Sequence, residues 1–225
     1  MTFSIVGRCS QTGQLGVAVS SSSISVGARC AWARAGVGAV ATQNVTLPSL
    51  GPRILDLLER ERIAPDAALE RALSETGWSE YRQVTVVDAQ GRTAMFTGRE
   101  ALGVHHAVTG DQCVAAGNLL TAPHVIDAMT AAFGRAQGAL ADRLLSAMRA
   151  AVDAGGEAGP VHSASLQIVD AQAWPIVDLR VDWADDDPIA QLKTLWHAYR
   201  PQMQAYIDRA LNPTAAPSYG VPGDE

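Results

Sequence analysis

The chain opens with Met1-Thr2-Phe3-Ser4-Ile5-Val6-Gly7 and continues, after a short connection, with Gly13-Gln14-Leu15-Gly16-Val17-Ala18-Val19-Ser20-Ser21. Both runs have the alternating apolar and small side chains that strands use to bury their faces. The connection, residues 7–13, has the glycines and small polar residues of a turn. The sequence therefore predicts a hairpin at the start of the chain. A third strand is expected over residues 37–43, where glycines and alanines allow close backbone approach.

The first side chain of this predicted hairpin is Thr2. Threonine is small enough that we expect Met1 to be removed, which would leave a free α-amine beside a hydroxyl on one residue. Such a residue carries a nucleophile together with its own general base. An unperturbed α-amino group has a pKa of about 7.7 to 8.0, near working pH. Because many chains begin with Met-Thr and make no use of it, the pattern gains meaning only from its surroundings.

Length and composition indicate an ordinary globular protein. Of its 225 residues, 48% are hydrophobic and 18% are charged, which is enough apolar material for a sizeable core. A formal charge of −6 argues against nucleic acid or an anionic membrane as the main partner. The odd set Cys9, Cys30 and Cys113 is typical of reduced thiols. With no apparent leader or membrane-length apolar run, we expect a cytoplasmic protein.

The remaining elements follow in an ordered series. Helical spacing predicts helices over 53–60, from residue 65, over 123–133 and over 139–152. Strands are predicted over 82–88, 93–97, 103–108, 112–116, 163–169 and 175–181. A long final helix is expected over about 188–211, broken or kinked at Pro201. We therefore expect one domain over 1–211 and a tail over 212–225, with two stacked sheets and helices outside them.

A long ordered series of residues connects this chain to a known family. It comprises Thr2-Phe3-Ser4-Ile5-Val6, Gly13-x-Leu15-Gly16-Val17-Ala18-Val19, Ser21, Val26-Gly27, the run 32–43 (WARAGVGAVATQ) and Gly51-Pro52. The series resembles the DUF1028 family, which is placed in the N-terminal-nucleophile (Ntn) hydrolase superfamily, and the resemblance extends from residue 2 to about residue 182. It implies an α+β fold: a four-layer αββα sandwich of two stacked, mainly antiparallel sheets flanked by helices.

The same resemblance implies a set of site residues. Thr2 would be the nucleophile that attacks an amide carbonyl, and Ser21 would orient its α-amine. Asn118 would either polarise the carbonyl oxygen or merely turn the chain. The residues expected to line the substrate site are Thr42, Gln43, Gly117, Glu157 and His162. For Thr42 and Gln43, packing at a strand edge is the alternative interpretation; for Ser22, Ser23 and Ser25 we expect only local turn contacts.

The loop after residue 154 departs from the family pattern. Glu157 takes the place of an acid in a Gly-Gly-Asp run, Gly159-Pro160 replaces an arginine-glycine pair, and His162 replaces a glutamine. The nucleophile is therefore expected to be kept while the loop that sets specificity differs.

Metal and cofactor chemistry are not expected. His105 and His106 are adjacent, so on a strand they would face opposite ways, and the other histidines lack the spacing of zinc ligands. No dinucleotide-binding, phosphate-loop or Gly-x-Ser-x-Gly motif is present in the sequence.

These observations predict an Ntn-type amidohydrolase that acts on a small amide, N-acyl, ureido or short peptide substrate and forms a homo-oligomer, with no nucleic acid or membrane partner. The alternative from another class is a catalytically silent binding or ring-forming protein of the same architecture. A third possibility is an internal nucleophile, such as Cys9 or Ser21. Retention of Met1 would favour the silent protein because it blocks the proposed base.

Overall fold

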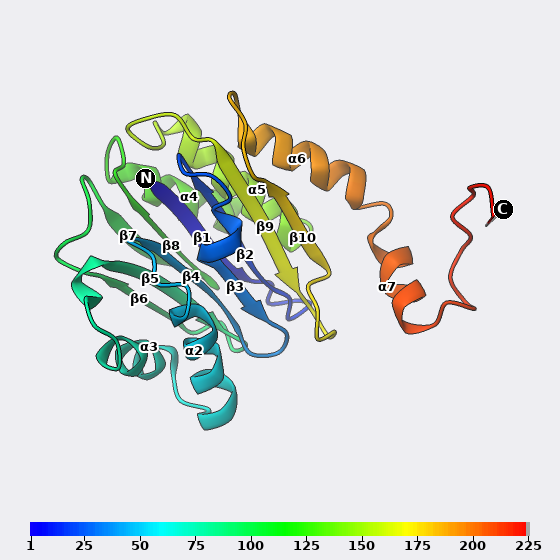
Figure 1. Ribbon diagram of the computed structural model, residues 1–225, viewed down its shortest axis with the longest axis horizontal. Coiled ribbons are helices and arrows are strands. Elements are labelled where there is room, and N and C mark those ends of the chain that lie inside the picture. Colours follow the sequence, from blue (N-terminus) through cyan, green and yellow to red (C-terminus); the bar gives the residue numbers. More distant parts are fainter. Residues whose placement is uncertain (224–225) are drawn as a thin grey trace.

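The computed structural model describes residues 1–223, and the body that precedes α7 (Met203–Leu211) has four layers in the order helices, sheet, sheet, helices (Figure 1). All strand pairs within the two sheets of the described residues are antiparallel. The predicted arrangement of two stacked antiparallel sheets flanked by helices is confirmed.

The larger sheet has six strands, with the opening hairpin near its centre. In spatial order they are β10 (Val177–Val181), β9 (Ser163–Val169), β2 (Leu15–Ser21), β1 (Thr2–Arg8), β8 (Cys113–Asn118) and β7 (His106–Gly110). The smaller sheet has the order β3 (Ala31–Arg34), β4 (Gly38–Asn44), β5 (Arg82–Asp88) and β6 (Thr93–Thr97).

Helices cover the outer face of each sheet. Against the larger sheet lie α4 (His124–Arg135), α5 (Leu140–Asp153) and α6 (Pro188–Tyr199). Against the smaller sheet lie α2 (Leu50–Asp56), its π-helical continuation η1 (Leu57–Glu61), and α3 (Pro65–Ser74). Two short helices, α1 (Gly27–Cys30) and η2 (Ser79–Tyr81), and the strand β3 were not predicted from the sequence.

The alternation along β1 decides which layer receives each side chain. Phe3 and Ile5 pack into the cluster formed with α4 and α5, whereas Val6 packs between the two sheets. Burying each such side chain contributes roughly 1.5–3 kcal/mol. Because side chains alternate, Thr2 lies on the same face of β1 as Val6 and is therefore directed into the layer between the sheets.

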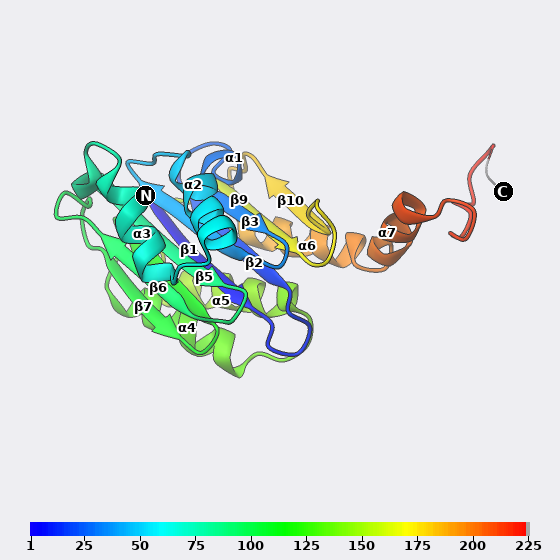
Figure 2. The same cartoon turned by 90° about the horizontal axis from the view of Figure 1, so that it is seen from below.

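The helix expected over 188–211, with a break or kink at Pro201, is divided at that residue in the structure. The structure has α6 and then α7 (Met203–Leu211), and Pro201 lies between them because proline cannot continue the helical hydrogen bonding. No residue of α7 is buried, and α7 and the following segment extend away from the body in both views (Figures 1 and 2). Across residues 1–223, no helix has the length and apolar character needed to cross a membrane.

Candidate active site

Three of the residues predicted to be catalytic meet at one end of the larger sheet. Thr2 is paired with Ser21 of β2 on one side and with Asn118 of β8 on the other. Directly opposed residues share a face and have Cβ atoms about 4.5–5.5 Å apart. All three are buried, with exposed fractions of 6%, 0% and 1%. The hydroxyl of Thr2 is therefore flanked by a serine and an asparagine.

A chain of hydroxyl groups leads from Thr2 to a positive charge. Thr2 Oγ1 lies 3.1 Å from Ser21 Oγ, which lies 2.8 Å from Ser23 Oγ. Ser23 Oγ accepts a hydrogen bond of 2.6 Å from Arg29 Nη2, and Arg29 is held over the serine loop by further bonds to the carbonyl oxygens of residues 24 and 25. Thr2 and Ser21 also donate to the carbonyl oxygen of Met1. The Thr2 hydroxyl thus connects through two serines to a guanidinium that is always charged.

Asn118 is positioned by amides from the smaller sheet. Its Nδ2 donates to Gln83 Oε1 at 3.2 Å, and the same oxygen accepts from Gln43 Nε2 at 2.8 Å. Gln83 Nε2 in turn donates to the carbonyl oxygen of Gly117 at 3.0 Å. These bonds cross the layer between the sheets and fix the orientation of the Asn118 amide. One N–H of that amide is used, and the second remains for another acceptor.

Glu157 lies beside the start of the chain, in an isolated bridge with Leu120, two residues beyond Asn118. Its side chain is buried, and within the described residues neither carboxylate oxygen has a hydrogen-bond partner of ordinary geometry. Burial raises the pKa of Glu157 to about 8, although the amino group of Met1 and the backbone and hydroxyl of Ser22 favour its charged form. A buried acid therefore faces the same end of the sheet as Thr2.

Other predicted residues are placed less directly. Thr42 shares the face of β4 that packs on α2 and α3, so its side chain is directed away from Thr2. Gly117 instead allows close packing, since a Cβ there would lie 2.7 Å from Leu120 Cδ2. The backbone N–H of His162 donates to the carbonyl oxygen of Ser21, but its ring stacks on Trp183 with 4.3 Å between centroids.

Sequence reasoning missed Gln83, Arg29 and the part played by Ser23. Gln83 had a detectable signal, because it is a long polar side chain next to the mostly apolar centre of its strand, residues 84–87. Arg29 had no such signal, because the four-residue helix that carries it is too short to show a helical hydrophobic period in the sequence.

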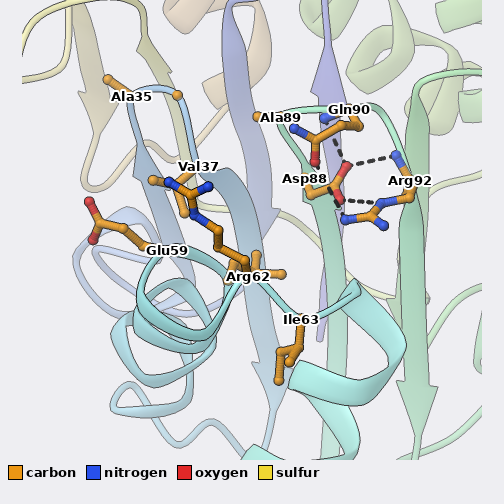
Figure 3. Close-up of a pocket in the computed structure, with 11 residues that line it drawn as sticks. Ala35, Val37, Glu59, Arg62, Ile63, Asp88, Ala89, Gln90 and Arg92 are labelled. Atoms are coloured by element: carbon orange, nitrogen blue, oxygen red, sulfur yellow. Dashed lines mark hydrogen bonds and ion pairs between the residues drawn. The ribbon is translucent and has the colours of Figure 1, made fainter.

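A polar cavity of about 430 Å³ lies far from this group, beyond the Asp88 end of β5 (Figure 3). Gln83 and Asp88 are five residues apart on that strand, or about 17 Å along it. The carboxylate of Asp88 accepts bonds from the backbone N–H groups of Gln90 and Arg92 and from Arg92 Nε. These bonds satisfy the Asp88 carboxylate and hold the turn, so we assign Asp88 a structural role.

The fold and this group of residues define an α+β sandwich with buried polar side chains at one end of its sheets. The model of the DUF1028 family, described as a family of unknown function, matches residues 2–192. The chain belongs to this family.

Among solved structures, a DUF1028 protein from Silicibacter pomeroyi is 31% identical with a TM-score of 0.82, and the match covers 88% of each chain. Anbu (ancestral beta-subunit) from Yersinia bercovieri is 13% identical with a TM-score of 0.41, covering 90% of this chain and 96% of that one. An Anbu mutant from Hyphomicrobium sp. strain MC1 is 12% identical with a TM-score of 0.43, covering 92% and 100%. At such low TM-scores, neither likeness to Anbu is evidence of function. No curated protein matches the chain.

Proposed function

We propose that the protein is an Ntn-type amidohydrolase in which Thr2, freed by removal of Met1, is the nucleophile. The observation that carries the proposal is the placement of the Thr2 hydroxyl, which is buried at the first position of β1 between Ser21 and Asn118. The substrates in view are small amides, N-acyl or ureido compounds and short peptides.

The first half of the reaction forms an ester. Thr2 Oγ1 attacks the amide carbonyl carbon while the α-amine of Thr2 takes the hydroxyl proton. The carbon–nitrogen bond then breaks, and the proton passes to the leaving amine. In the second half, water attacks the ester carbonyl and gives its proton to the α-amine. The carbon–oxygen bond breaks, the proton returns to Thr2 Oγ1, and a carboxylic acid is released.

Two neighbours support these steps. The spare N–H of Asn118 can donate to the oxygen on which negative charge develops, and its orientation is already fixed by Gln83. Ser21 can accept from the α-amine and so direct its lone pair towards the hydroxyl. Arg29 donates to Ser23, which leaves the Ser23 hydroxyl hydrogen available for Ser21. Ser21 can then direct its own hydroxyl hydrogen towards Thr2.

The alternative is a catalytically silent binding or ring-forming protein of the same architecture. While Met1 is attached, the nitrogen of Thr2 is an amide and has no basicity at working pH. The carbonyl oxygen of Met1 then also engages the hydroxyls of both Thr2 and Ser21. Retention of Met1 in protein purified from its own cell would favour this alternative.

Variants at position 2 test the proposal, with intact mass measured first to establish that Met1 is absent. Thr2→Ser should keep measurable turnover, because both hydroxyl and α-amine remain and only the methyl group is lost. Thr2→Ala should lose roughly 10³-fold or more, as expected when a nucleophile is removed. An electrophile that acylates hydroxyls should label residue 2 of the wild type.

Thr109→Ala is the matched control, since Thr109 lies exposed on the edge strand β7 of the same sheet. It should leave turnover unchanged. Unaltered hydrolysis by folded Thr2→Ala would show that β1 is only structural.

We also propose self-association into at least a homodimer. The helix α7 has nine residues, none of them buried, and isolated helices of that length are marginal in water. Its exposed apolar side chains include Tyr206 and Leu211, at 40% and 60% exposure. A second copy of the chain covering this arm would stabilise it.

A further inference from the structure

Met1 occupies the place that the acyl part of a substrate must occupy, if Thr2 is the nucleophile as proposed above. Its carbonyl group is bonded to the nitrogen of Thr2, and the carbonyl oxygen accepts from Thr2 Oγ1 and Ser21 Oγ. An acyl group on Thr2 Oγ1 differs from the Met1 acyl group only in the atom that carries it, oxygen instead of nitrogen. Transfer between these two atoms of Thr2 passes through a five-membered ring. The acyl-enzyme therefore places its acyl group close to where Met1 now lies.

The amino group of this residue lies near Glu157 without a hydrogen bond to its carboxylate. It lies close enough to favour the charged form of the Glu157 carboxyl. Glu157 is 5% exposed, and in the part of the chain that the structure describes its two oxygens have no hydrogen-bond partner of ordinary geometry. An unpaired acid is costly to bury, and an ammonium group is the partner that offsets this cost.

The side chain of Met1 lies over Gly159. A Cβ at position 159 would stand 2.9 Å from Met1 Cε and 3.4 Å from Met1 Sδ. A side chain at position 159 would displace the end of the Met1 side chain, and glycine leaves that space open. The same loop thus supplies both an acid for the amino group and room for an unbranched apolar side chain.

We propose that the substrates are amides of α-amino acids with a free ammonium group, bound by Glu157, and with an unbranched apolar side chain over Gly159. Aminoacyl amides and the first residue of short peptides have this chemistry. N-Acylated amides of the same residue lack the charge that Glu157 would pair.

Binding to processed Thr2→Ala protein tests this without turnover. The probes are L-methioninamide and N-acetyl-L-methioninamide, compared by calorimetry at pH 7, where most α-amines are protonated. At pH 7 the raised pKa of Glu157 leaves its carboxyl mostly protonated, so the ligand's ammonium group must displace that proton when it pairs with the acid. We expect the free amine to bind at least about tenfold more tightly, in line with a hydrogen bond between the charged groups that result. Glu157→Gln should abolish this preference, while Glu70→Gln, a change at an exposed acid on α3, should keep it.

A second variant tests the side-chain space. Gly159→Val should weaken binding of L-methioninamide and spare glycinamide, which has no side chain to displace. Circular dichroism establishes that each variant is folded.

Two results would overturn the proposal. One is equal binding of both methionine amides to Thr2→Ala. The other is an equal loss of hydrolysis by Glu157→Gln on free and N-acetylated substrates, which would mean that Glu157 pairs with the α-amine of Thr2 itself. The proposed function fails by a different result, namely hydrolysis that survives in Thr2→Ala. That result does not depend on how tightly either amide binds.

Discussion

Glu157 shows how burial changes the pKa of a single side chain. Its carboxyl has a pKa of about 8 instead of 4.5, because burial disfavours the charge more than the nearby amino group and Ser22 favour it. Between those two values the folded protein therefore binds more protons than the unfolded chain. Stability from this residue is present below pH 4.5 and is lost as the pH rises through 8.

We therefore predict that Glu157→Gln removes a pH-dependent loss of stability. Between pH 5 and pH 8 the free energy of unfolding of the wild type should fall by a few kcal/mol relative to that of the variant, since each pKa unit corresponds to about 1.4 kcal/mol. Urea unfolding at several pH values measures the difference. Parallel curves for the two proteins would contradict the prediction.

Ser21 gives a second prediction at this scale. Ser21→Ala removes the hydroxyl that lies 3.1 Å from Thr2 Oγ1 but leaves Thr2, the proposed nucleophile, and its amine. Turnover should fall roughly tenfold, as expected for a hydrogen bond of about 1.4 kcal/mol, and KM should change little. Ser146→Ala, at an exposed position of α5, is the control. Complete loss of turnover in folded Ser21→Ala would instead make Ser21 the nucleophile.

Elements with a strong period could be predicted from the sequence. The opening hairpin alternates over seven residues in each strand, and α4 and α5 each bury one apolar face. The segment 27–34 could not be predicted, because its helix and its strand have only four residues each. A four-residue element is stabilised by its neighbours and leaves no readable pattern.

The candidate site was predictable only in part for a related reason. Thr2, Ser21 and Asn118 meet because register aligns three strand ends, and the resemblance had already selected them. Thr42 was expected near the substrate, yet alternation along β4 turns it to the helix side, which strand geometry alone could have revealed. The hydrogen bond that Asn118 donates to Gln83 joins residues 35 positions apart, and no local pattern encodes it.

The packing of α2 on β3 supplies an element-scale prediction. A Cβ at Gly51 would lie 2.2 Å from Trp32 Cγ, so Gly51→Ala must push the helix from the strand or displace the indole. We expect a loss of stability of about 1–3 kcal/mol, typical of overpacking. Gly77→Ala is the control, because a Cβ there meets nothing within 4 Å. Equal thermal midpoints for the two variants would show that α2 moves freely.

At the scale of the whole molecule, the body and the C-terminal arm differ in how they are held. The body has three apolar clusters, one between each pair of adjacent layers. The arm is attached through α6 and projects from the body in both views (Figures 1 and 2). Only Met203 and Ile207 of α7 pack partly against the main cluster. A helix with so little support in one chain is where a second copy would contribute most.

The last prediction concerns this arm. If two copies associate through α7, sedimentation of the full chain at micromolar concentration should show at least a dimer. Leu211→Asp should then shift the protein towards monomer, because it places a charge in an apolar contact. Leu102→Asp, which changes a similarly exposed residue of a distant loop, should leave the assembly intact. Monomeric wild type would contradict self-association altogether. A dimer that Leu211→Asp does not weaken would place the interface elsewhere on the body, leaving α7 as an arm that folds without a partner.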